Sequence, residues 1–378
     1  MAGIYLHIPY CKQACLYCNF HFSTSIKSRN DFVSALLKES LLQKEYLQGE
    51  RIETIYFGGG TPSLLANEEL VAIIENLYSI FDIDEDSEIT LEANPDDISA
   101  VQLRNWRKAG INRLSIGVQS FFEEDLRWMN RAHSADQAAS CIQSALSGGF
   151  SNISIDLIYG SPGLTDERWE QNLSKAVAMA IPHLSCYALT LEPKTAMYHL
   201  VSEKKMLPPD PDKQAAQFSY MMEALETEGY EHYEISNFAL SGKRSRHNSA
   251  YWQGKNYLGL GPSAHSFDGK SRQWNVAANG PYIRSLINNQ VPFEIELLNQ
   301  EQKINEYIMI SLRTSEGLDL TWVSEQFGEP VRQTIVEMAA SFIGAKRLEK
   351  KNEKLLLTKE GKLFADGIAA SLFFRDRV

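Results

Sequence analysis

The sequence has few cysteines, no long apolar run and no excess of positive charge. Five cysteines in 378 residues are too few for a disulfide framework. The longest apolar stretch, residues 176–191, is interrupted by Pro182 and His183 and is shorter than the roughly 20 apolar residues of a membrane-spanning helix. The net charge of −11 is not the basic footprint of a nucleic-acid binder. We therefore expect no integral membrane segment and no nucleic-acid partner.

The N-terminal residues MAGIYLHIPYCK do not combine a basic segment with a following apolar one, so no secretory signal is expected. A reducing, cytoplasmic location is the resulting expectation. Transient membrane association stays open as an alternative, and so does a homodimer. With 44% hydrophobic and 22% charged residues, the composition is that of an ordinary globular protein.

Short β-rich runs alternate with longer helical patterns over the first 235 residues. The β-rich runs fall at 4–8, 54–57, 89–92, 113–118, 153–158 and 184–189. The helical patterns fall at 30–47, 68–80, 100–108, 135–147, 167–179 and 212–228. This alternation predicts a parallel sheet with helical crossovers. Six units fit a partial barrel or an open doubly wound sheet, and they are too few for a closed eight-stranded barrel.

The alternation of β-rich runs and helical patterns ends after residue 235. Residues 236–300 are rich in Asn, Gly, Ser and aromatic residues, which predicts loops with short elements. Three helices and a hairpin are then expected at 301–312, 320–327, 331–343 and 347–358. This order resembles a winged-helix arrangement. We therefore divide the chain into a core domain, 1–235, and a C-terminal domain, 236–378.

Three of the five cysteines stand together in the segment CKQACLYC, as Cys11, Cys15 and Cys18. Small hydrophobic residues on one helix face would give a similar spacing, but the segment begins as a loop after a proline. Converging thiolates suit a soft metal centre. Zinc, with His7 or His21 as a fourth ligand, is one alternative. The other is a [4Fe-4S] cluster with one iron left without a cysteine ligand.

An iron without a cysteine ligand can chelate the amino and carboxylate groups of S-adenosylmethionine (SAM), and the C-x3-C-x2-C spacing is typical of the radical-SAM superfamily. The loop GGGTP, from Gly58 to Pro62, directly follows the second predicted strand, as it does in that superfamily. There it lies against the amino-acid end of SAM. Glycine lets the backbone approach a ligand closely.

Polar residues also follow several other predicted strands. Glu92, Gln119, Asp156 and Glu192 lie at or near the ends of the third, fourth, fifth and sixth strands. Active sites of α/β barrels form at the C-terminal face of the strands. These side chains therefore predict a polar ligand in the same mouth as the cysteine loop.

Five segments together resemble the HemN/HemW group of that superfamily: YLHIPYC, GGGTP, ITLEANP, LSIGVQSF and DLIYG. The group comprises oxygen-independent coproporphyrinogen III oxidases and their heme-chaperone relatives, and the resemblance covers essentially the whole chain. It implies a partial (β/α)6 radical-SAM barrel with a smaller α-rich, winged-helix-like C-terminal domain. It also implies a [4Fe-4S] cluster on Cys11, Cys15 and Cys18, with SAM at the open iron.

The resemblance further implies which residues contact SAM. They are Tyr5, Tyr17, Gly59, Gly60, Thr61, Glu92, Gln119, Arg131 and Asp156. Arg131 stands in the segment MNRAH, where the group has a similar arginine, and a guanidinium suits a carboxylate partner. Glu92 and Asp156 suit the SAM ammonium group or the ribose hydroxyls.

Two departures separate this sequence from the oxidases of the group. The oxidases carry a further cysteine two residues after the third cluster cysteine, where this chain has Phe20. They also carry a long N-terminal extension, whereas here the first cluster cysteine is already residue 11. Both features resemble the heme-chaperone branch of the group.

The segment HNSAYW, which begins at His247, is similar to a motif of the heme chaperones. Neutral imidazole is a normal axial ligand of heme iron, and Tyr251 and Trp252 offer flat faces to a porphyrin. The resemblance therefore implies His247 as a heme ligand. The alternative is a structural histidine in a loop with aromatic core neighbours.

The function implied by these features is that of a heme chaperone, which binds heme and transfers it to acceptor hemoproteins of the respiratory chain. One rival is oxygen-independent coproporphyrinogen III dehydrogenase activity, and another is a radical-SAM reaction on a different substrate. The cluster and SAM groups look intact, which leaves open whether the protein is an enzyme.

Overall fold

The computed structural model describes residues 2–375 and contains one twelve-stranded sheet and a separate three-stranded sheet. Six strands pair in parallel in chain order: β1 (Ala2–Ile8), β2 (Ile52–Gly59), β3 (Ile83–Ala93), β4 (Arg113–Gln119), β5 (Ile153–Tyr159) and β6 (His183–Ala188). These are the six predicted strands. Their side chains are buried almost throughout, as expected for a parallel sheet that is covered on both faces.

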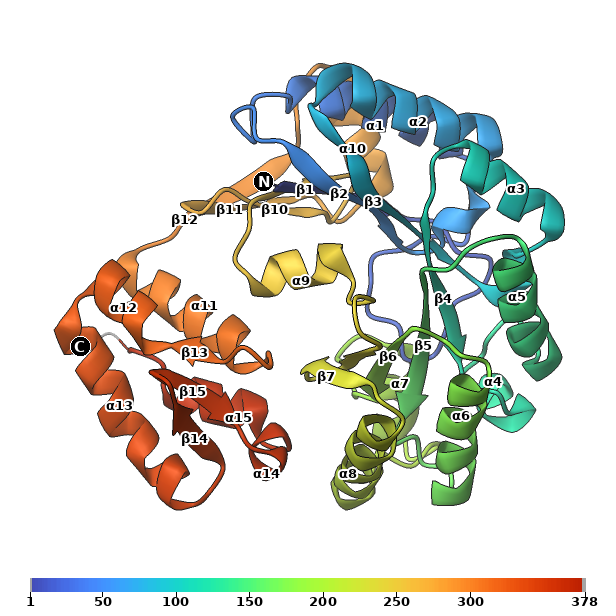
Figure 1. The fold of residues 1–378 in the computed structure, drawn as a ribbon. Coiled ribbons are helices and arrows are strands. Elements are labelled where there is room, and N and C mark those ends of the chain that lie inside the picture. Colours follow the sequence, from blue (N-terminus) through green and yellow to red (C-terminus); the bar gives the residue numbers. More distant parts are fainter. Residues whose placement is uncertain (1, 376–378) are drawn as a thin grey trace.

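Six helices cover the outer face of this curved sheet (Figure 1). They are α1 (Arg29–Leu42), α2 (Asn67–Ile80), α3 (Ala100–Lys108), α5 (Ala135–Ser147), α6 (Asp166–Ala178) and α8 (Pro211–Thr227). Local sequence fixes where they begin, because Ser99, Ser134 and Thr165 each accept a backbone N–H from the first turn of their helix. Within residues 2–375, every helix is too short or too polar to cross a membrane.

Residues 231–297 extend the same sheet at both edges. Strand β9 (Tyr257–Leu260) pairs in parallel with β1, and β10 (His265–Phe267), β11 (Ser271–Asn275) and β12 (Phe293–Leu297) follow in antiparallel pairs. At the other edge, β8 (Asn237–Ala239) pairs with β6, and β7 (Glu231–Glu234) pairs with β8. We therefore propose that the domain boundary lies between β12 and the next helix rather than at 235/236.

The short helix α9 (Arg246–Trp252) lies inside the arc of the sheet, against β1 and β2 (Figure 1). Its first backbone N–H groups donate to the carboxylate of Glu88, at 3.2 Å from Arg246 and 3.1 Å from His247. A carboxylate at a helix start satisfies N–H groups that have no partner within the helix. The helix therefore occupies the N-terminal end of the strands and leaves their C-terminal end open.

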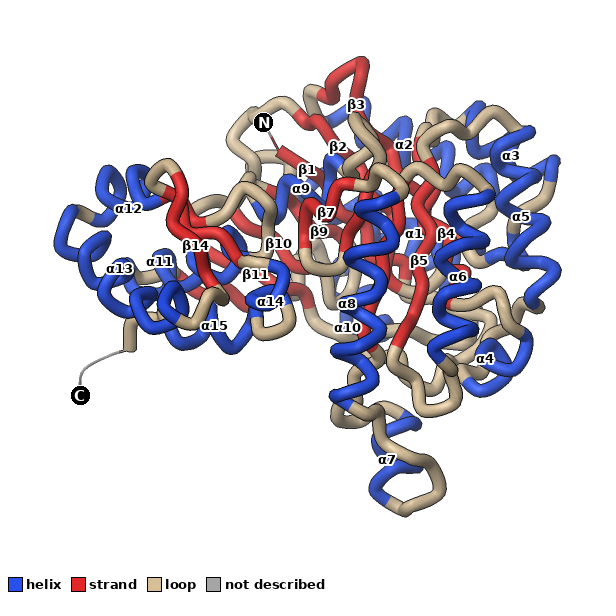
Figure 2. The backbone as a smooth tube through the Cα atoms, turned by 60° about the horizontal axis from the view of Figure 1, so that its bottom comes forward, coloured by secondary structure: helices blue, strands red, loops and turns tan. Residues whose placement is uncertain are grey.

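The C-terminal elements form a second unit with a core of its own, beside the open side of the sheet (Figure 2). Its helices and strands are α11 (Gln300–Leu312), β13 (Leu318–Asp319), α12 (Leu320–Phe327), α13 (Glu329–Gly344), β14 (Leu348–Lys351), β15 (Lys354–Leu357), α14 (Lys359–Lys362) and α15 (Ala365–Ser371). The three predicted helices and the hairpin are present. Asn352 and Glu353 form the hairpin turn with φ of 49° and 57°, the left-handed values that two-residue hairpin loops favour.

Candidate cluster and cofactor site

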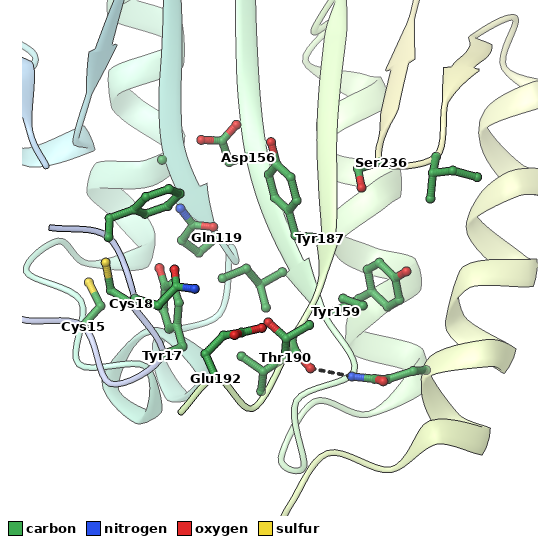
Figure 3. A pocket seen from close by; sticks show the side chains of 18 of the residues that line it. Cys15, Tyr17, Cys18, Gln119, Asp156, Tyr159, Tyr187, Thr190, Glu192 and Ser236 are labelled. Carbon is green, nitrogen blue, oxygen red and sulfur yellow. Dashed lines mark hydrogen bonds between the residues drawn. The ribbon is translucent and has the colours of Figure 1, made fainter. Parts of the chain in front are cut away.

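A cavity of about 970 Å³ opens at the C-terminal ends of the parallel strands. All of the predicted cluster and SAM residues except Tyr5 line it. In Figure 3, Cys15, Cys18 and Tyr17 lie together on the cysteine loop, while Gln119, Asp156 and Tyr187 extend from neighbouring strands. The topology therefore brings together residues that are more than 100 positions apart in the sequence.

The cysteine loop is held against the segment between β4 and α5. The backbone N–H of Leu16 donates to the carbonyl of Met129 at 3.2 Å, and the side-chain amide of Asn130 donates to the Ala14 carbonyl at 2.7 Å. Leu16 also packs against the small apolar cluster that contains Met129 and Ile158. These contacts fix the loop in front of the strand ends, so the thiols face the cavity.

Two of the three sulfur atoms accept hydrogen bonds from one connected polar network. Arg131 donates from Nη1 to Cys15 Sγ at 3.3 Å and from Nη2 to Asn94 Oδ1 at 2.6 Å. Asn94 donates to Thr61 Oγ1 at 3.2 Å, and the Thr61 hydroxyl donates to Cys11 Sγ at 3.5 Å. Donors aimed at sulfur stabilise thiolate, which is the form that binds metals.

The donor set fits an iron–sulfur cluster better than a single ion. A four-iron cluster takes each thiolate on a separate iron, so its cysteines stand farther apart than the ligands of one ion. Within the described part of the chain, no three His, Cys, Asp or Glu side chains are grouped closely enough for one ion. The zinc alternative required His7 or His21, but His7 Nε2 donates to the His21 carbonyl at 2.8 Å and His21 Nε2 contacts Asn279 Oδ1 at 2.7 Å.

Burial opposes the ionisation of two of the three thiols. Burial raises the pKa of Cys18 to about 11, and burial also raises the pKa of Cys11. A coordinating metal deprotonates a thiol outright, so cluster binding would overcome this shift.

Packing alone requires glycine at two positions of the glycine loop. A Cβ on Gly60 would lie 2.7 Å from the Tyr10 carbonyl oxygen and 2.8 Å from that of Ile8. Gly59 has a φ of 106°, and a Cβ there would lie 2.7 Å from the His7 ring. The two glycines therefore let the end of β2 pass directly behind the start of the cysteine loop, a reason for glycine that adds to the ligand approach expected from the sequence.

Glu92 and Asp156 form an acidic end of the cavity. Burial, together with the nearby Asp156 carboxylate, raises the pKa of Glu92 to about 7, and burial raises the pKa of Asp156 to about 6. The Tyr56 hydroxyl donates to Glu92 Oε1 at 2.8 Å. A ligand cation placed here would favour ionisation of both groups, because an opposite charge stabilises a carboxylate. This end therefore suits an ammonium group or hydroxyls.

Gln119 stands at the end of β4 with a φ of 65°, which is uncommon for a residue other than glycine. The pairing of β4 with β5 is irregular between Ile116 and Gln119. This irregularity turns the Gln119 side chain toward the cavity. Backbone strain of this kind occurs at functional sites that the surrounding structure holds in place.

Two predicted residues lie outside the cavity lining. The Tyr5 hydroxyl is 3.3 Å from His7 Nδ1, and the Tyr5 ring faces the Tyr56 ring.

The other residue, His247, is only 2% exposed, with Nδ1 2.8 Å from Thr54 Oγ1 and Nε2 2.9 Å from the Tyr251 hydroxyl. The His247 ring centroid lies 5.0 Å from that of Tyr56, whose hydroxyl donates to Glu92, so His247 stands one side chain behind the cavity lining. Heme ligation by His247 stays a prediction, and it would require α9 to move.

The cavity also contains residues that the sequence reasoning did not assign. Asn94 links Arg131 to Thr61. Its position in the ITLEANP segment could have indicated that it belongs to the site. Tyr187 comes from β6, while Lys362 and Phe364 come from the C-terminal unit. No motif marked these three, and Lys362 and Phe364 line the cavity only because the second unit packs against the barrel mouth.

The fold and the cysteine loop define this chain as a radical-SAM protein with a HemN-type C-terminal domain. The model of the radical SAM superfamily matches residues 5–176, and the model of the HemN C-terminal domain matches residues 298–364. A solved structure of coproporphyrinogen III oxidase (HemN) from Escherichia coli superposes with a TM-score of 0.85, over 98% of this chain and 90% of that chain. At 22% sequence identity this similarity concerns the fold, and it confirms the predicted α/β architecture with an unclosed sheet.

The chain belongs to the HemW family. It is 31% identical to the heme chaperone HemW of Bacillus subtilis, over 97% of this chain and 98% of that protein. It is 32% identical to the heme chaperone HemW of Mycobacterium tuberculosis, over 98% of this chain and 94% of that protein. The protein of the same name from Escherichia coli is 31% identical over 97% of this chain and 96% of that protein. The family resemblance inferred from the sequence is thereby confirmed.

Proposed function

We propose that this protein is a heme chaperone: it binds heme at the mouth of the barrel and transfers it to acceptor hemoproteins of the respiratory chain. The family membership supports heme as the cargo. Acceptors of this kind would be met in the cytoplasm or at the membrane surface.

The observation that carries this proposal is the apolar outer part of the cavity. Three aromatic side chains line it and remain exposed: Phe20 at 65%, Tyr187 at 44% and Phe364 at 44%. They come from the cysteine loop, from β6 and from the C-terminal unit. Large exposed apolar side chains around one opening are typical of a binding site, and aromatic rings offer flat faces to a flat ligand.

In this proposal, Cys11, Cys15 and Cys18 bind a [4Fe-4S] cluster, and the polar inner part of the cavity binds SAM. A reduced cluster held there would supply an electron to the sulfonium group of SAM. Arg131 faces the carboxylate of SAM, and Glu92 and Asp156 face its ammonium group or ribose hydroxyls. Cofactor and cargo would then occupy neighbouring parts of one cavity.

The rival function is oxidation of coproporphyrinogen III, the activity named for the E. coli structure of the same fold. Phe20 occupies the position where the resemblance places a further cysteine in those oxidases. Its exposed ring contributes a contact surface instead of a thiol. The same site therefore supports binding of a tetrapyrrole more directly than its decarboxylation.

An anaerobic incubation separates the two functions. Cluster-reconstituted protein is mixed with SAM, a reductant and coproporphyrinogen III, and the porphyrins and 5′-deoxyadenosine are measured by chromatography. We expect no protoporphyrinogen, while a coproporphyrinogen dehydrogenase run in parallel converts its substrate. The Cys15→Ala variant provides the background for both deoxyadenosine and protoporphyrinogen. Formation of more protoporphyrinogen by the wild-type protein than by this variant would contradict the chaperone function.

A further inference from the structure

We propose that Lys362 binds a carboxylate of the cargo, namely a propionate group of heme. This inference rests on the proposed function and assigns one end of the same cavity to the charged edge of the ligand. Lys362 ends α14 and lines the cavity beside Phe364.

The Lys362 ammonium group is held in place by a neutral imidazole. Its Nζ lies 2.9 Å from Nδ1 of His232, whose Nε2 lies 3.0 Å from the carbonyl oxygen of Ile235. A carbonyl only accepts, so Nε2 of His232 carries the proton and Nδ1 accepts from Lys362. The imidazole stacks on Phe238 with ring centroids 4.1 Å apart, which fixes its orientation. The ammonium group is therefore positioned by a partner that does not neutralise it.

The other cations of the cavity wall are already engaged by several partners. Arg313 forms ion pairs with Glu234 at 3.0 Å and with Asp366 at 2.7 Å. Arg131 is engaged by Asn94, Gly117 and the cysteine loop. Among the described residues that line the cavity, Arg131 and Lys362 are the cations without a carboxylate partner, and only Lys362 has a single side-chain hydrogen bond.

Burial lowers the pKa of Lys362 to about 8, because it destabilises the charged form of the ammonium group. A bound anion would stabilise that charged form. Near Glu92 and Asp156 the cavity disfavours an anion, and in the proposed function Arg131 already faces the carboxylate of SAM. A flat ligand with carboxylates on one edge would therefore place that edge at Lys362 and its rings against Phe364, Tyr187 and Phe20. Heme combines these two features, a flat apolar ring system and carboxylates on one edge.

The test compares hemin with its dimethyl ester, in which both propionates are uncharged. Both are titrated by absorbance into the full-length, cluster-reconstituted protein in the same detergent buffer. We expect Lys362→Met to weaken hemin binding about tenfold, because a hydrogen bond to a charged group is lost. The dimethyl ester should bind the wild-type protein and Lys362→Met equally, and Lys362→Arg should restore hemin affinity. Lys359→Met is the matched control, because Lys359 lies on the same helix and pairs with Glu226.

The outcomes are distinguishable. No binding of hemin by the wild-type protein would overturn the proposed function and this inference with it. Hemin binding that is equal in the wild-type protein and Lys362→Met would overturn the inference alone. An equal loss for hemin and for the dimethyl ester would also overturn it, because the effect would then come from shape rather than from charge.

Discussion

Replacing any one of Cys11, Cys15 and Cys18 by alanine is expected to abolish the iron–sulfur cluster. The three thiols face one cavity, and a cluster that already has one iron without a cysteine has no spare protein ligand. After anaerobic reconstitution, the wild-type protein should contain about four irons per chain and absorb light at about 410 nm. Each variant should lose most of both, while far-ultraviolet circular dichroism shows that the fold is retained.

The chain offers two matched controls for this experiment. Cys141 on α5 and Cys186 on β6 are buried and do not line the cavity. Cys141→Ala and Cys186→Ala should therefore keep the wild-type iron content and absorbance. A variant that lacks all three loop cysteines and still carries the cluster would disprove the assignment of the ligands.

Arg131→Met is expected to weaken SAM binding by about a hundredfold. The guanidinium is buried between the cysteine loop and the ends of β3 and β4, where it donates to Asn94 and to the Gly117 carbonyl at 2.8 Å. In the proposed SAM site its loss would remove the cation that faces the carboxylate, and charge-assisted hydrogen bonds are worth about 1.5–3 kcal/mol each. SAM affinity is measured by equilibrium dialysis on the reconstituted protein.

Arg127→Met is the control for this variant. Arg127 lies four residues earlier and is 75% exposed, paired with Glu123 on the same short helix, α4 (Glu123–Trp128). It should leave SAM affinity unchanged. Both variants should retain the cluster absorbance, because the cysteine ligands are intact. If Arg131→Met bound SAM as tightly as the wild-type protein, the carboxylate role of Arg131 would be wrong.

Local patterns were sufficient to predict the parallel core. The run 153–158 is apolar except for Asp156, and in the structure Asp156 is the residue of β5 that is not fully buried and that lines the cavity. The cysteine loop could be predicted for the same reason, because all three cysteines lie within eight residues. The order of the C-terminal helices and hairpin also follows from local periodicity and from caps such as Asp319, which accepts from Thr321 and Trp322.

The edges of the sheet could not be predicted, because their pairing is not local. Strand β9 pairs with β1 across more than 250 residues, and β8 and β10 have three residues each, too few for an alternating pattern. The outer wall of the cavity was missed for the same reason. Lys362 reaches the cavity only because α14 packs beside β7, and no sequence pattern marks a cation that contacts a histidine 130 positions away.

The most direct test of the chaperone function is the kinetics of heme transfer. Protein loaded with hemin is mixed with the apo form of a membrane-bound respiratory cytochrome, and holocytochrome formation is followed by absorbance at increasing acceptor concentration. The rate of heme dissociation is measured separately with an excess of a heme-scavenging apoprotein. Direct transfer predicts a rate that rises with cytochrome concentration and exceeds the dissociation rate. A rate that never exceeds spontaneous dissociation would mean that the protein binds heme without delivering it, which would contradict the proposed function.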